Sequence, residues 1–285
     1  MVQEGVMNYS LQLYVQKIKK IPTLPVIAQE ILRLVNDEMT TVDALEEIVE
    51  QDPPIAAKIL SVANSAFFGF KHPALTVNEA IVRIGFNNLR NIALGISLMS
   101  VLDHERSEQG FDYEKIYRHS VLVGGMATEL SKELGLAIAS EVFVNGMLHD
   151  IGYLVLNRFF PDSFASVLNE FGRGTPLLEA EKVVLNFTHT DVGTWLGEKW
   201  RLPESFLDTI CYHHTPSQAK THVQHTAVTH IADYLTIQNT FKITESDPHY
   251  PLDNAALEVL NLSKKDLSDL QQKIGDQLVS VDRME

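Results

Sequence analysis

The 285-residue sequence contains a single cysteine, Cys211, which excludes an internal disulfide and fits a reducing compartment. It also lacks a long apolar run, since the longest mostly apolar stretch, residues 92–102, is too short to span a bilayer. The opening residues, MVQEGVMNYS, have neither the basic region nor the apolar block of a signal peptide. These absences predict a soluble, cytoplasmic protein that does not associate with membranes.

Basic residues are also scarce. The chain has 23 lysines and arginines against 37 aspartates and glutamates, a formal net charge of -14. Such a charge repels the phosphates of DNA and RNA, so we expect no nucleic-acid partner. A small anionic ligand is still compatible with this charge, because a local cation can override the global field.

Sustained period-two alternation, the pattern of β-strands, is hard to find, whereas apolar residues recur at helical spacing almost everywhere, as in VDALEEIVEQ. Helix-start signals agree: Thr41 precedes one such run, and Asp52 followed by two prolines precedes another. A further periodic stretch, residues 77–102, is expected to break near Gly85. The sequence therefore predicts an all-α fold.

Polar connections divide the chain into three expected parts. The segment DHERSEQGFD at residues 103–112 separates an N-terminal helical part, residues 1–108, from a second helical part, residues 109–240. A stretch with two prolines then leads into a C-terminal helical extension, residues 241–285, with one amphipathic segment over 257–278. A single composite core across the first connection is the alternative.

The stretch GMLHDIGYL places His149 and Asp150 in an otherwise apolar run. Burial of an unpartnered charge is costly, so such a pair usually has a hydrogen bond, an opposite charge or a metal as partner. Adjacent side chains on a helix diverge by about 100°, so both residues reach one ion only if it lies close to the backbone. By the same argument, one of His213 and His214 is expected to face away.

Further histidines and one aspartate in the second part suggest ligands of the same kind, and the full candidate set is His119, His149, Asp150, His189, His213, His214 and Asp233. Five imidazoles and two carboxylates suit iron, manganese, zinc or nickel better than calcium, as one or two divalent ions. Two such ions would leave a positive charge of about two for a phosphate-containing small ligand. The alternative is a set of histidines held by carboxylates within a helical core.

Neighbouring ionisable residues fit other roles. His222, His225 and His230 are interpreted as surface residues or as partners of the ligands, not as ligands. Glu179 and Glu181 fit a solvated helix face, although the family resemblance described next implies an acidic position just before His189.

The order His, HD, His, HH, Asp resembles the HD superfamily of metal-dependent phosphohydrolases, including its HD-GYP branch. The chain is more similar still to the HDOD domain, the HD-related output domain of bacterial signalling proteins. This resemblance covers about residues 15–240 and rests on the segments IPTLPVIAQEIL, DPPIAAKILSVANSAFFG, EAIVRIGFNNLRNIAL, GMLHDIG and HTDVGTWLGEKWRLP, together with the HH pair.

The resemblance implies a ligand assignment. The first metal would be held by His119, His149, Asp150 and Asp233, and Asp150 would bridge to a second metal held by His189, His213 and His214. HD-GYP proteins commonly place a lysine after HDIG and an acidic residue after HH, where this chain has Tyr153 and Thr215, and the GYP signature is absent.

The sequence therefore predicts a bacterial signal-transduction output protein that retains a divalent metal site and acts through regulatory interactions with other signalling proteins. The alternative is a metal-dependent phosphohydrolase acting on a nucleotide or another phosphate ester. In that case Asp150 would be catalytic, and Arg118, Arg158 and Lys182 would be the nearest basic candidates for gripping a phosphate.

Overall fold

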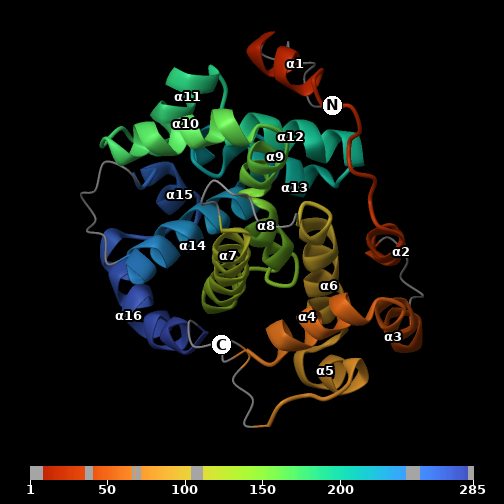
Figure 1. Ribbon diagram of the computed structural model, residues 1–285. Helices are drawn as coiled ribbons and strands as arrows, with labels where there is room; N and C mark the ends of the chain where they lie inside the picture. The colour runs from red at the N-terminus through yellow and green to blue at the C-terminus, as the bar shows by residue number, and fades with distance from the viewer. Residues whose placement is uncertain are drawn as a thin grey trace.

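The computed structural model describes residues 9–35, 41–65, 68, 72–103, 112–241 and 251–281. Within these ranges every regular element is a helix, which confirms the predicted all-α fold (Figure 1). The N-terminal elements are α1 (Tyr9–Val15), α2 (Val26–Val35), α3 (Val42–Glu50), α4 (Pro53–Ala63), α5 (Val77–Ile84) and α6 (Phe86–Ser100). The central elements are α7 (Tyr113–Glu133), α8 (Val142–Leu148), α9 (Ile151–Phe159), α10 (Pro161–Gly172), α11 (Leu177–Leu185), α12 (His189–Trp200), α13 (Glu204–Tyr212), the short 3-10 helix η2 (Pro216–Gln218) and α14 (Val223–Phe241). The C-terminal elements are α15 (Asn254–Val259) and α16 (Lys264–Val281).

Local capping explains where several helices begin. The Thr41 hydroxyl accepts a hydrogen bond from the Ala44 amide at 3.3 Å before α3, and Asp52 accepts one from the Ile55 amide at 3.1 Å before α4. Gly85 separates α5 from α6 with φ of +87°, a conformation that residues with a side chain rarely adopt. The predicted starts and the predicted break at Gly85 are confirmed.

Helices α2–α6 and α14–α16 lie on opposite sides of the central α7–α9 group (Figure 1). One cluster of buried apolar residues nevertheless runs from Leu11 through α6 to Ile210. Packing of α6 on α8 is close, because a Cβ added to Gly95 would lie 2.6 Å from the Met147 sulfur. The N-terminal and central helices therefore share a core.

The first helix packs on central helices instead of its sequence neighbours. The Tyr14 ring contacts the rings of Phe160 and Phe187 edge-on, each at 5.0 Å between centroids. Farther along, the Trp200 indole donates a hydrogen bond to the Pro22 carbonyl at 2.8 Å. The predicted division into three parts stays a prediction: its boundary at 108 lies outside the described residues, and that at 240 falls at the end of α14.

The C-terminal helices cover α7 and α14 through a second apolar cluster, to which Met126, Ile231, Leu257 and Leu267 contribute. The expected single amphipathic segment over 257–278 was wrong, since α15 ends at Val259 and α16 begins at Lys264. The break follows from local hydrogen bonding, because Ser263 caps α16 by accepting a bond from the Asp266 amide at 3.2 Å. No helix within the described ranges is both long and apolar enough to cross a membrane.

Two glycines bring α7 and α8 together. A Cβ on Gly146 would lie 2.6 Å from the Gly124 Cα, and one on Gly124 would lie 2.6 Å from the Phe143 carbonyl oxygen. Only residues without a side chain allow the two backbones to approach this closely. This contact places His119 on α7 near His149, which follows α8.

Candidate metal centre

The HD pair lies at a break between two helices. His149 follows the last residue of α8, and Asp150, with φ of -99° and ψ of 16°, precedes α9. The expectation that both residues lie within one helix was wrong. The chain turns between α8 and α9, so the angle of about 100° between adjacent side chains of one helix does not apply to His149 and Asp150. Their side chains therefore approach each other.

The first group of candidate ligands comes from three helices. His119 on α7, His149 and Asp233 on α14 have ligand atoms that all lie within 4.8 Å of one another. His119 Nε2 is 3.0 Å and His149 Nε2 is 3.8 Å from Asp233 Oδ1. The Nδ1 of His149 donates to the Gly146 carbonyl at 2.7 Å, so its Nε2 is the atom available to the group.

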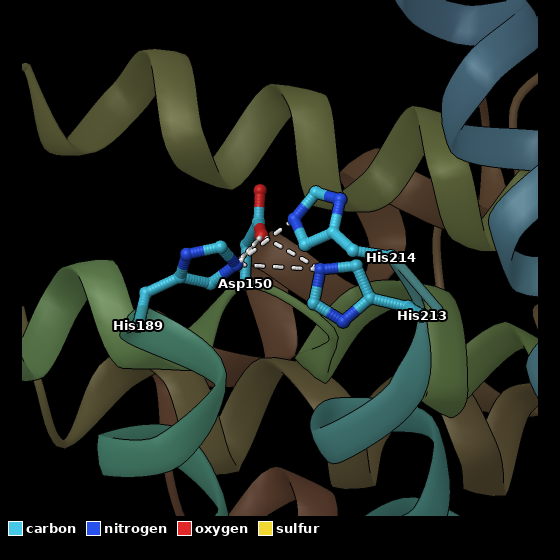
Figure 2. A group of neighbouring side chains, drawn as sticks. All are labelled: Asp150, His189, His213 and His214. Carbon is cyan, nitrogen blue, oxygen red and sulfur yellow. Dashed lines mark hydrogen bonds and ion pairs between the residues drawn. The ribbon is translucent and has the colours of Figure 1, made fainter. Parts of the chain in front are cut away.

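The second group contains Asp150, His189, His213 and His214, again within 4.8 Å of one another. Figure 2 shows the three imidazoles turned toward the Asp150 carboxylate. His189 Nε2 lies 3.3 Å and His213 Nε2 lies 3.5 Å from Asp150 Oδ1. His214 Nε2 lies 3.2 Å from His189 Nε2.

Asp150 connects the two groups through its two oxygens. Its Oδ2 lies 3.2 Å from His149 Nε2 and 3.8 Å from His119 Nε2, whereas its Oδ1 faces His189 and His213. A carboxylate placed in this way can bridge two cations, one on each oxygen. The structure thus brings all seven predicted residues into one site with Asp150 at its centre.

His213 and His214 both reach the second group. The expectation that one of them faces away was wrong, because α13 ends at Tyr212 and both histidines lie in the turn that follows. The His213 Nδ1 is held by the carbonyls of Thr209 and Ile210 at 3.2 and 3.1 Å, which directs its Nε2 toward Asp150.

Glu181 supports the site; the sequence left it open between a solvated helix face and an acidic position near His189. Its side chain is completely buried on α11 and accepts hydrogen bonds from the His189 ring Nδ1 at 2.9 Å and from the His189 amide at 2.7 Å. The available signal was helical spacing: Glu181 lies four residues after Leu177 and three before Val184, on the apolar face of α11. Glu179 lies off that face and pairs with Lys182 at 2.8 Å.

Tyr153 occupies a defined place in the site. Its ring stacks on the His189 ring with 4.0 Å between centroids and 24° between planes, and only 6% of the residue is exposed. An aromatic side chain therefore covers the candidate ligand His189 from the position three residues after Asp150. Together with Glu181, it fixes the orientation of His189.

The remaining central histidines lie outside the two groups, as predicted, but two of them are not surface residues. His225 and His230 are buried, with 7% and 4% exposed. His225 Nε2 lies 3.1 Å from Glu141 Oε2, and His230 contacts the His213 carbonyl at 2.7 Å.

The buried carboxylates and imidazoles strongly affect one another. Although burial alone acts in the opposite direction, Asp150 raises the pKa of His149 to about 9, and Glu181 with Asp150 raises the pKa of His189 to about 10. Burial lowers the pKa of His213, and burial with two neighbouring imidazoles lowers the pKa of His214 well below its usual value. A metal ion would compete with protons for the nitrogens of His149 and His189, because an imidazole ligand has to be deprotonated.

The residues present fit a pair of divalent ions. Among the described residues, His149 Nε2 and Asp233 Oδ1 are buried atoms with no hydrogen bond of good geometry. Their near neighbours are other candidate ligands, since His119 Nε2 lies 3.0 Å from Asp233 Oδ1 and Asp150 Oδ2 lies 3.2 Å from His149 Nε2. Buried polar atoms are normally hydrogen-bonded, and a metal ion is one partner that would satisfy both. The donor set of imidazole nitrogens and carboxylate oxygens suits iron, manganese, zinc or nickel.

Replacement of Glu181 by glutamine is expected to weaken metal binding by about 10- to 100-fold, because outer carboxylates of this kind orient a histidine and increase its basicity. The measurement is the Kd for Mn²⁺ by titration. Glu179→Gln is the matched control, since Glu179 lies two residues earlier on α11 with a side chain that is 57% exposed. Equal Kd values for the two variants would contradict the role of Glu181.

The HDOD domain family matches residues 21–216, more than half of the chain. The protein belongs to the HDOD family. An uncharacterized protein of Treponema pallidum (strain Nichols) is 25% identical over 199 residues, which cover 70% of this chain and 38% of the relative. The HDOD protein therefore spans well under half the length of the curated relative it matches.

Solved structures share the fold. An HDOD domain protein of unknown function from Geobacter sulfurreducens superposes with a TM-score of 0.79 at 22% identity, covering 97% of each chain. A protein from Shewanella amazonensis SB2B, provisionally named a phosphohydrolase, gives 0.74 at 24% identity over 95% of this chain and 98% of its own. A protein from Marinobacter aquaeolei VT8, provisionally named a signal transduction protein, gives 0.75 at 22% identity over 96% and 64%. These likenesses establish the fold.

Proposed function

We propose that this HDOD protein is a bacterial signal-transduction output module whose central helices hold two divalent transition-metal ions, and that it acts through regulatory contacts with other signalling proteins. The observation that carries the metal centre is the position of Asp150, whose two oxygens face two separate groups of imidazoles. His119, His149 and Asp233 would complete the first position, and His189, His213 and His214 the second.

Most side chains of the centre are buried, and each ligand group has one partly exposed histidine. The side chains of His149, His189 and His213 are completely buried, whereas those of Asp233, Asp150 and His119 are 10%, 11% and 18% exposed. His214 in the second group is also only partly buried, as His119 is in the first. A water molecule or a phosphate oxygen would therefore approach either metal position past one partly exposed histidine.

A regulatory role is favoured by the engagement of the three nearest basic candidates elsewhere. Arg118 pairs with Glu114 at 3.4 Å, Lys182 pairs with Glu179 at 2.8 Å, and Arg158 donates to the Val101 carbonyl. Phosphoryl-transfer sites use cations to neutralise the charge that develops on the phosphate. Each of these three side chains would have to leave its present partner before it could contact a phosphate.

Elemental analysis of freshly purified protein tests the proposal. The expected result is about two iron, manganese, nickel or zinc ions per chain, one for each ligand group. A higher melting temperature after metal loading is expected too, because a ligand that binds only the folded chain stabilises it. A chain with no metal as purified and no binding after titration with these four ions would contradict the proposal.

Metal-dependent hydrolysis of a phosphate ester is the second candidate, supported by the complete ligand set and by the partial exposure of His119 and His214. Two bound ions would polarise a phosphoryl group and generate the attacking hydroxide. The test is a panel of phosphomonoesters, nucleotides and cyclic dinucleotides with manganese, iron or nickel under reducing conditions. Turnover that disappears in a metal-depleted sample would favour hydrolysis, and no turnover from fully loaded protein would favour the regulatory role.

A further inference from the structure

His230 lies behind the metal centre and holds two distant parts of the chain with its two ring nitrogens. Its Nδ1 lies 2.7 Å from the carbonyl oxygen of His213, and its Nε2 accepts a hydrogen bond from the Asp253 amide at 2.9 Å. A carbonyl can only accept and an amide can only donate, so the ring is neutral with its proton on Nδ1. Protonation or loss of the ring breaks at least one bond.

Asp253 is where the C-terminal helices begin. Its side chain accepts hydrogen bonds from the Ala255 amide at 2.9 Å, which starts α15, and from the Ser217 amide at 3.3 Å in η2. Beyond it, Leu257 and Leu267 are buried against α7 and α14. The bond from His230 thus connects the anchor of the C-terminal helices to the turn that carries two candidate metal ligands.

We infer that His230 couples docking of α15 and α16 to the geometry of the second metal position, so that metal binding and C-terminal docking favour each other. The inference rests on the proposed metal centre and adds a route by which that centre is regulated. His213 is held from one side by the metal position and from the other by His230. Coupling between two binding events is reciprocal, so an event that displaces α15 would weaken metal binding, and loss of metal would loosen α15.

Two substitutions at Asp253 isolate the single bond that carries the coupling. Asp253→Ala removes the capping carboxylate and keeps the backbone N–H, whereas Asp253→Pro removes both. Proline fits the backbone there, because the φ of Asp253 is -77°, within the range of about -65 ± 15° that the proline ring imposes. The difference between the two variants therefore reports the bond to His230.

The expected result is a Kd for Mn²⁺ about fivefold or more weaker in Asp253→Pro than in Asp253→Ala. Hydrogen exchange of metal-free protein gives a second readout. The amides of His213 and Thr215, which bond to the Thr209 and Tyr212 carbonyls at 3.0 and 2.8 Å, should exchange faster in the proline variant. If the proline variant does not fold, His230→Phe with His225→Phe as control replaces the pair, since both histidines are buried on α14 and only His230 contacts His213.

The outcomes separate the two claims. Equal Kd values and equal exchange rates in the paired variants, with normal metal binding by the wild type, would overturn the coupling and leave the metal centre standing. A wild-type protein that binds none of iron, manganese, nickel and zinc would overturn the metal centre and the coupling together.

Discussion

Asp150→Asn is expected to abolish metal binding at both positions, lowering affinity by more than about 100-fold. Changes to outer partners of a ligand already cost about 10- to 100-fold, and the two oxygens of Asp150 face the two ligand groups. An asparagine of the same size has one oxygen in place of two and no charge, so it cannot bridge. Elemental analysis and Mn²⁺ titration of the variant beside wild type measure the effect.

Asp208→Asn is the matched control for this substitution. Asp208 is also buried, with 7% exposed, and its carboxylate accepts a hydrogen bond from the His222 amide at 2.9 Å, outside both ligand groups. The control is expected to lose some stability and keep its metal. Retention of stoichiometric metal by Asp150→Asn would show that Asp150 does not bridge.

Gly152→Ala is expected to destabilise the fold by about 3 kcal/mol, because overpacking of a closed contact typically costs about 1–3 kcal/mol or more. The added Cβ would lie 1.9 Å from the His189 carbonyl oxygen, which belongs to the backbone at the start of α12. Either α9 or α12 has to move, and each carries one side of the metal site. Thermal unfolding followed by circular dichroism should show a melting temperature lower by roughly 6–12 °C.

Gly172→Ala supplies the comparison, since a Cβ at this position on α10 would meet nothing within 4 Å. Its melting temperature is expected to stay unchanged or to rise by the equivalent of about 0.4–1 kcal/mol. If Gly152→Ala melts at the same temperature as Gly172→Ala, the α9–α12 contact is looser than the structure indicates.

Much of the fold was predictable from local signals. Thr41 and Asp52 start helices with a side-chain oxygen, and Gly85 breaks one, so each acts within a few residues of itself. The placement of α1 was not predictable in the same way. Tyr14 packs on Phe160 and Phe187. The spacing of apolar residues shows that a helix has a buried face, but it does not show which distant residues that face contacts.

The candidate site was also predictable only in part. Residue types and their order predicted all seven members of the two groups, although metal binding itself stays a prediction. The errors concerned local backbone geometry. Both the HD pair and the HH pair were predicted to lie within a helix, where adjacent side chains diverge, but both pairs follow the end of a helix. The sequence did not decide between a buried and a solvated Glu181, because burial of a carboxylate on an apolar helix face depends on a partner. That partner, His189, is identified only in the folded structure.

Residues outside the matched family region contribute to the core and to the candidate site. The matched HDOD domain, residues 21–216, ends before Asp233 and begins after Tyr14. A fragment cut at those limits would leave the first metal position with two imidazoles and one shared carboxylate, and would uncover Phe160 and Phe187. The region that matches the family and the stretch of chain that contains all seven candidate ligands are therefore different lengths of polypeptide, and the longer one is the unit to express.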